Sequence, residues 1–205
     1  RRAAGQVVKF SGHVEDSNGN NVVDQTFNGT LSAEIYDRNE TLTCKDNDGS
    51  AGRIGRSPLT FTMHGHRVFR GTTRVENGHF TITASIPRDI SYSDDAAKIS
   101  FYAVSDDKQT ECNGVNSGFH LNGTAKQASP DTLAPKVGAY LNEVETPEYG
   151  VVNRNPTLIA DISDDAGINI AGTSIGHDIE LTLDDDLSNT TSLNDYFTYA
   201  PGSYN

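Results

Sequence analysis

Residues 67–87 read RVFRGTTRVENGHFTITASIP, and this stretch decides the fold. Two segments with strand signals, Arg67–Val75 and His79–Ile86, flank the turn Glu76-Asn77-Gly78. Asn-Gly readily takes the positive φ angles that a tight hairpin needs, and Pro87 ends the second strand because proline cannot donate to a ladder. The stretch therefore predicts a β-hairpin.

Further strand signals lie on both sides of this hairpin. They cover Val7–Val14, Gly29–Tyr36, Leu59–Met63, Lys98–Val104 and Ser117–Leu121. In Gly29–Tyr36, the residues Leu31, Ala33 and Ile35 share one face. Residues 37–57 are polar and glycine-rich and predict a long loop, and Ser93–Ala97 is the best candidate for a short helical turn. About seven short strands punctuated by turns are typical of an immunoglobulin-like β-sandwich.

A linker divides the chain in this interpretation. Gly123–Pro135 has two prolines and few apolar residues, as expected of a domain boundary. Strand signals resume at Val137–Leu141, Thr157–Ile162 and Asp178–Leu183, and residues 193–199 could supply one more. So few strands leave an apolar face and a sheet edge unprotected. The sequence predicts an all-β chain with an immunoglobulin-like β-sandwich at residues 1–128 and a second, acidic, truncated β-sandwich at residues 131–205.

The negative charge lies mostly in the last third. Residues 1–129 hold 14 Lys and Arg against 15 Asp and Glu, whereas residues 130–205 hold 2 against 13. A strongly acidic region repels nucleic acid phosphates and suits a basic partner or divalent cations. No apolar run approaches the roughly 20 residues of a membrane span. We therefore expect no nucleic acid partner and no membrane-spanning segment.

One arrangement of residues invites a catalytic interpretation. Caspase-like peptidases place a His-Gly after one apolar strand and a nucleophilic Cys after a later one. Here His64-Gly65 follows a strand, but Cys112 follows the polar loop 105–111, and no parallel α/β pattern surrounds either. A hairpin histidine and a structural cysteine are the better interpretation, so we predict no catalytic residues.

Metal sites are predicted only weakly. His64 and His66 share a strand face and His79 lies on a neighbouring strand, but no fourth zinc ligand is evident. The run 16–20 (Asp-Ser-Asn-Gly-Asn) lacks the glycine and glutamate positions of a calcium loop and reads as a turn. The better calcium candidates are the hard oxygen ligands of Asp164, Asp165, Asp184, Asp185 and Asp186. Solvated loop acids remain the alternative, and no other cofactor is expected.

The two cysteines, Cys44 and Cys112, lie far apart in the sequence. In an oxidising compartment they could form a disulfide that staples a sandwich. In a cytosolic protein they would be two free, buried thiols, and the sequence leaves both alternatives open.

A series of motifs in a fixed order resembles a known family. The motifs are Phe27-Asn28-Gly29, Ile35-Tyr36-Asp37, Val68-Phe69-Arg70-Gly71, residues 75–80, residues 86–92, residues 98–103, Asn155-Pro156, residues 164–169, residues 175–179 and Leu193-Asn194-Asp195-Tyr196. They resemble the region after the catalytic domain in gingipain-like cysteine peptidases of the Bacteroidetes type IX secretion system, the PorU family. The resemblance spans nearly the whole chain.

The resemblance implies a function for a longer protein. Family members are associated with the outer membrane at the cell surface, cleave the C-terminal secretion signal from exported cargo and join the cargo to lipopolysaccharide. Their catalytic domain would lie upstream of Arg1, and its His and Cys have no matching positions here. In the family the second sandwich continues with further strands, so this chain is expected to be truncated within it.

Two functions follow from these observations. In the first, the chain is a non-catalytic region that braces the upstream peptidase domain or binds cargo or other secretion components. In the second, it is a stand-alone cell-surface module that binds carbohydrate or protein. A sandwich fold hosts both roles.

Overall fold

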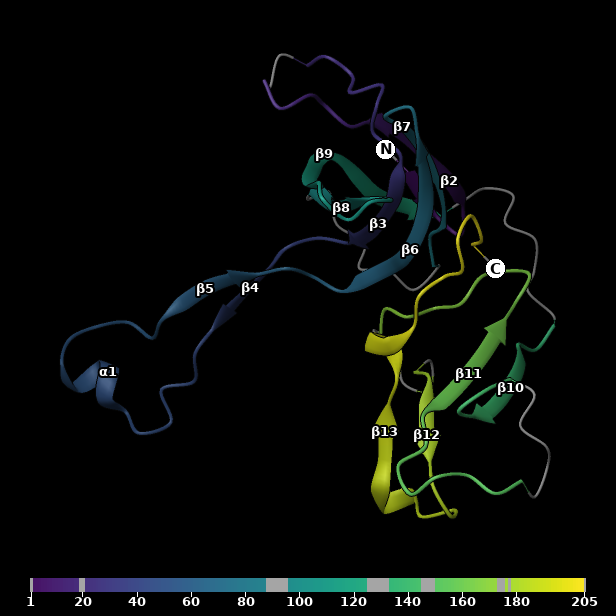
Figure 1. The fold of residues 1–205 in the computed structure, drawn as a ribbon. Coiled ribbons are helices and arrows are strands. Elements are labelled where there is room, and N and C mark those ends of the chain that lie inside the picture. Colours follow the sequence, from purple (N-terminus) through teal and green to yellow (C-terminus); the bar gives the residue numbers. More distant parts are fainter. Residues whose placement is uncertain are drawn as a thin grey trace.

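The computed structural model describes residues 2–18, 21–87, 96–124, 133–144, 150–172, 176 and 178–204. The expected helical turn at Ser93–Ala97 and linker at Gly123–Pro135 fall largely outside these residues. Within them the chain is almost entirely β-structure, as predicted (Figure 1).

Seven strands form one hydrogen-bonded sheet. They are β1 (Arg2–Ala4), β2 (Val7–His13), β3 (Gly29–Tyr36), β6 (Arg67–Glu76), β7 (His79–Ser85), β8 (Ala96–Ser105) and β9 (Glu111–Thr124). Their order across the sheet is β1-β9-β8-β3-β6-β7-β2. Every pair is antiparallel except β1 and β9, which are parallel.

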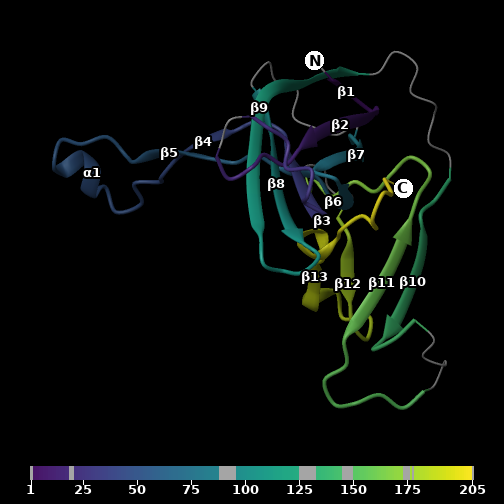
Figure 2. The same cartoon turned by 45° about the horizontal axis from the view of Figure 1, so that its top comes forward.

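The sheet curls until its two ends meet. β1 and β2 follow each other directly in the sequence yet form opposite edges of the sheet, so the edges must lie close together (Figure 2). Side chains confirm the curl, because Phe10 of β2 packs on Phe119 of β9 with ring centroids 5.4 Å apart. Phe80 of β7 likewise packs on Phe101 of β8 at 5.3 Å, although the two strands are not neighbours. The result is the predicted all-β sandwich.

The hairpin predicted from the sequence is formed by β6 and β7, and both strands contribute residues to the core. Asn77 and Gly78 take φ angles of 48° and 76°, as the turn requires. On β3 the predicted face is confirmed, since Leu31, Ala33 and Ile35 are buried opposite Thr73, Gly71 and Phe69 of β6. Alternation with a period of two thus delivers one face of each strand to the interior.

β6 and β7 stay paired only next to their turn. Their ladder holds Val75 opposite Phe80 and Glu76 opposite His79. The earlier part of β6 is bonded to β3 on one edge, which leaves its other edge open. The C-terminal segment fills this edge: the Tyr199 N–H donates to the Arg70 carbonyl at 2.9 Å and the Gly202 N–H to the Thr72 carbonyl at 3.1 Å.

Tyr199 carries the same segment into the core. Its ring stacks on Phe69 with centroids 5.1 Å apart, and its hydroxyl accepts from the Ile168 N–H at 2.7 Å and donates to the Ile168 carbonyl at 2.9 Å. Ile168, Ile170 and Ala171 are buried in the same cluster as the sandwich core. The division at residues 1–128 and 131–205 stays a prediction, but residues on both sides of it share one apolar core.

Two small hairpins make up the rest of the last third. β10 (Lys136–Leu141) pairs with β11 (Leu158–Ser163), and β12 (Glu180–Thr182) pairs with β13 (Thr190–Ser192). A strand expected at residues 193–199 is instead a 3-10 turn, η2 (Asn194–Tyr196), followed by the C-terminal segment; a second 3-10 turn, η1, covers Leu187–Asn189. The Asn194 side chain fixes the η2 turn, because it accepts from the Ile179 N–H at 2.8 Å and donates to Asp178 at 2.6 Å.

β9 was predicted too short and β13 was missed, because both lack an apolar pattern. β9 begins at Glu111 rather than at Ser117, and residues 111 and 113–118 are exposed. The polar Thr-Thr-Ser of β13 is also exposed. Such strands follow from backbone pairing with a neighbour rather than from burial.

The β6–β7 turn yields a stability prediction. A Cβ added at Gly78 would overlap the Asp24 carbonyl, whereas at Gly55, whose φ is 66°, it would meet nothing. We expect Gly78→Ala to lower the free energy of unfolding by clearly more than the roughly 1 kcal/mol of left-handed strain. Gly55→Ala is the matched control, and urea unfolding measures both. Equal losses would show that the close approach at Gly78 is unimportant.

Tyr199 yields a pH prediction. Burial raises the pKa of its hydroxyl to about 12. Between pH 10 and 12 the unfolded chain therefore loses this proton while the folded chain keeps it, so stability falls as the pH rises, by about 2–3 kcal/mol over the window. Tyr199→Phe should be less stable at pH 8, since it leaves the Ile168 N–H without its partner, and should lack this component of the alkaline loss. Urea unfolding from pH 8 to pH 11.5 measures both effects, and identical pH slopes would contradict the assignment.

Candidate functional site

Residues 38–66 leave the sandwich as a long arm (Figure 1). The arm consists of β4 (Glu40–Thr43) and β5 (Thr60–Met63), which pair only with each other, and a single-turn helix α1 (Ser50–Arg53) near the tip. The sequence predicted only a loop over residues 37–57, so β4 and α1 correct that prediction. The stretch gave no strand signal because it is polar and contains three glycines, and because its strand does not join the large sheet.

The arm has two chemically distinct faces. Opposed pairs are Glu40 and Met63, Thr41 and Thr62, Leu42 and Phe61, and Thr43 and Thr60, while the Cys44 N–H bonds the Leu59 carbonyl. Because opposed residues share a face and neighbours alternate, one face carries threonines only. The other, here called the apolar face, carries Leu42, Cys44, Leu59, Phe61 and Met63, with the charged Glu40 opposite Met63 at its base.

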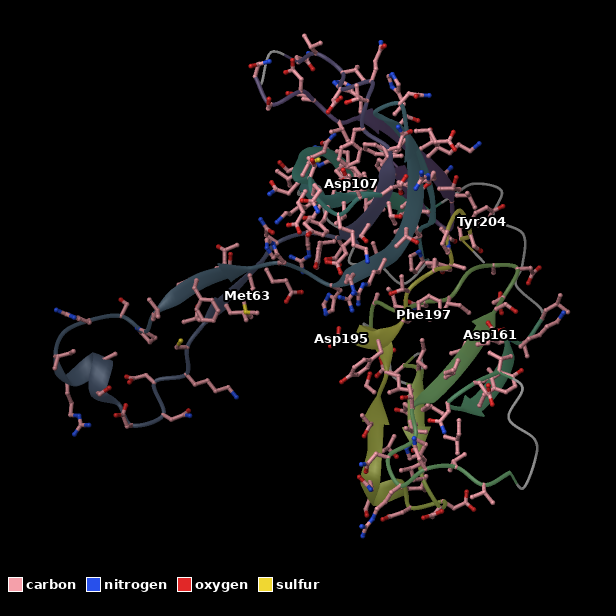
Figure 3. The ribbon with its side chains drawn as sticks, viewed as in Figure 1. Met63, Asp107, Asp161, Asp195, Phe197 and Tyr204 are labelled. Carbon is pink, nitrogen blue, oxygen red and sulfur yellow. The ribbon has the colours of Figure 1, made fainter. Side chains whose placement is uncertain are left out.

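The apolar face is open to water. Leu59 is 68% exposed, Met63 50% and Phe61 40%, and Met63 extends clear of the sandwich in Figure 3. A two-stranded ribbon is marginally stable by itself, and clustered exposed apolar side chains mark interaction sites. The apolar face is therefore the best candidate for a binding surface.

The tip of the arm is shaped by carboxylates. Asp46 accepts the Ala51 N–H at 3.1 Å, and Asp48 accepts the Ser50 N–H at 3.0 Å. The hydrogen bonds from Ser50 lower the pKa of Asp48. No residue of α1 is buried, and the adjacent Ile54 is 67% exposed, so the tip also presents an apolar side chain to solvent.

A second apolar surface lies between the two small hairpins. It is a groove of about 460 Å³ between β11 and the β12–η2 region. Its lining residues are Leu158, Ile159, Ala160, Ile162, Ile179, Leu181, Leu193, Tyr196 and Phe197. In Figure 3, Phe197 lies between the sandwich and the hairpins. The groove lies in the region for which the sequence predicted a truncated second sandwich, and that division stays a prediction.

The structure does not bring His64 and Cys112 together. The His64 ring packs on Tyr36 and its Nε2 lies 3.3 Å from Lys98 Nζ, whereas Cys112 pairs with Ala103. Lys98 and Ala103 are five residues apart on β8, or about 16 Å at the usual rise of a strand. This separation is too large for a nucleophile and its base.

The metal candidates are also separate. Asp164 is buried and accepts the Ala166 N–H at 2.8 Å, while Asp184 and Asp185 form the β12–β13 turn and Asp186 caps η1 through Ser188. His79 pairs with His13 on β2, away from His64 and His66. Among the residues described above, no three His, Cys, Asp or Glu side chains are arranged to hold a metal ion.

Both cysteines are free thiols, so the disulfide considered between Cys44 and Cys112 is not formed. The alternative of two buried thiols is wrong for Cys44, which is exposed on the arm, whereas Cys112 is half-buried on β9. The arm projects away from the sheet, and this geometry keeps the two apart (Figure 1).

We also searched the helices for a membrane-spanning segment. In the described part of the chain, no helix has the length and apolar character that crossing a bilayer requires.

The fold defines the class of this chain as an all-β sandwich protein with a projecting arm. No family model matches the sequence, and no curated protein matches it. Among solved structures, the crystal structure of dimeric latent PorU from Porphyromonas gingivalis matches 98% of this chain with 25% identity and a TM-score of 0.59.

The match covers only 18% of the PorU chain. The present chain is thus similar to one region of a much larger protein. At the level of the fold it is a PorU-like fragment, in agreement with the resemblance drawn from its motifs.

The thiols provide a test of this geometry. Burial raises the pKa of Cys112 and so lowers its reactive thiolate fraction, whereas Cys44 is exposed. We expect iodoacetamide at pH 8 to modify Cys44 well before Cys112, and both at similar rates in urea. Peptide mass spectrometry over a time course measures this, and faster modification of Cys112 in the native protein would contradict the structure.

Proposed function

We propose that this chain is a non-catalytic, protein-binding region of a cysteine peptidase of the type IX secretion system. The apolar face of the arm is the observation that carries the proposal. It presents five apolar side chains on a ribbon whose two strands, in the described part of the chain, form ladder hydrogen bonds only with each other. The partner that fits it is the peptidase domain of the parent protein, which this region would brace.

The similarity to PorU supports the proposal that this chain belongs to a larger peptidase. The chain matches a limited part of a protein whose structure is described as dimeric and latent. The peptidase domain that the arm contacts can therefore belong to the same polypeptide or to a second copy. In either case the contact buries the same apolar face.

The parent protein is proposed to act on exported cargo. It would remove the C-terminal secretion signal and attach the cargo to lipopolysaccharide at the outer membrane, on the cell surface. All catalytic groups for these reactions would lie in the peptidase domain. The region described here would set the position of that domain or hold cargo or secretion partners.

The gene itself gives the first test. Its sequence upstream of the codon for Arg1 should encode a caspase-like domain with a His-Gly and a Cys. A signal peptide directly before Arg1 would instead support a stand-alone surface module.

Binding to the peptidase domain encoded by the same gene gives the second test. We expect the double variant Leu42→Ser/Phe61→Ser to weaken binding by about tenfold or more, because burying each side chain is worth about 1.5–3 kcal/mol. Thr41→Ser/Thr62→Ser, on the opposite face, should leave the affinity within about twofold. Biolayer interferometry measures both, and an equal loss in the two variants would sink the assignment of the apolar face.

A further inference from the structure

The arm leaves the sandwich through a narrow neck. The Asp37 N–H donates to the His66 carbonyl at 3.0 Å, which joins the two strands where the arm begins. Next to this bond, a Cβ on Gly65 would overlap the Arg38 carbonyl and the Asp37 carboxylate. The two segments of the chain that form the neck, around Asp37 and around His66, are therefore tightly packed against each other.

The Asp37 side chain is buried in this neck. It is 2% exposed, and neither of its carboxylate oxygens has a hydrogen-bond partner. A buried carboxylate without a partner is costly, by several kcal/mol when ionised. The neck thus needs a counter-charge close to Asp37.

His66 is placed to provide it. Its Nδ1 lies 3.7 Å from Asp37 Oδ2 and 3.7 Å from Glu40 Oε1, and it too lacks a hydrogen-bond partner. The imidazole thus bridges the end of β3 and the start of β4. Its side chain is 37% exposed, so it can exchange protons with water.

Two of the other cations near the neck, Arg67 and Lys98, contact other groups. Arg67 contacts Glu34 at 3.5 Å and Asp195 at 2.8 Å. The Lys98 ammonium lies against His64 rather than His66. In the described residues, Arg38 forms no ion pair with Asp37, although its Nε is buried nearby without a partner.

We propose that a proton on His66 fixes the arm at its neck and that loss of this proton frees it. An imidazolium attracts both carboxylates and supplies the charge that Asp37 lacks. A neutral imidazole leaves Asp37 buried and unpaired, so the neck opens toward water. Histidine side chains change charge between about pH 5 and 8, which makes the stiffness of the arm sensitive to mild acid. The proposal concerns the motion of the arm itself and holds whichever partner the arm contacts.

Time-resolved FRET across the neck tests this proposal. One dye goes on the exposed Cys44 of the arm and the other on a cysteine introduced by Lys9→Cys, at an exposed position of β2. Cys112→Ser removes the remaining thiol. We expect the distribution of dye distances to be narrow at pH 5.5 and to broaden at pH 8.

Variants at the neck assign the effect. His66→Gln should give the broad distribution at both pH values, and Asp37→Asn should remove most of the pH response because it removes the buried charge. His64→Gln is the matched control and should keep the response of the parent. A parent distribution that does not change with pH, or a His66→Gln variant that keeps the change, would overturn the proposal. If circular dichroism shows that His66→Gln is unfolded, the Asp37→Asn variant provides the test instead. An unchanged pH response in Asp37→Asn would then overturn the proposal.

Discussion

The stacking of Tyr199 on Phe69 is the contact on which the rest of the structure depends. It closes the gap that opens where β6 and β7 separate, and it brings the C-terminal segment into register with β6. The Tyr199 hydroxyl then holds Ile168 through two hydrogen bonds, so the loop that carries Ile170 and Ala171 joins the core as well. Without this ring, the sandwich would lack one end of its interior. The small hairpins would also lose apolar packing that attaches them to the sandwich.

A network of charges on the outside of β6 reinforces the same attachment. Asp195 of η2, labelled in Figure 3, pairs with Arg67, and its carbonyl accepts from Arg70 at 3.0 Å. Glu34 of β3 lies against both arginines. The Asp195 side chain is 91% exposed, so the pair with Arg67 contributes at most about 1 kcal/mol. Apolar packing therefore provides most of the attachment, and the charges set its register.

The sequence predicted the sandwich well because its strands bury one face each. Leu31, Ala33 and Ile35 alternate as required, and Asn77-Gly78 fixes the turn. Of the arm, the sequence predicted the strand at Leu59–Met63 but not its partner β4, because β4 lies in a polar stretch and, among the described residues, pairs only with β5. Thr43 pairs with Thr60 across 16 intervening residues, so no short turn motif in the sequence marks this hairpin. The role of Tyr199 was equally hidden, because its partner Phe69 lies 130 positions earlier.

The position of Tyr199 in the chain also bears on how the protein folds. Contacts between residues far apart in sequence form late, because the intervening chain must first be brought together. A polypeptide that emerges from its amino end would complete β1 to β9 with the edge of β6 unpaired and Phe69 uncovered. Among the described residues, Tyr199 and Gly202 donate the backbone hydrogen bonds that satisfy that edge. The interior of the sandwich can therefore be completed only after Tyr199 has been synthesised, although all seven strands of the sheet precede it in the sequence.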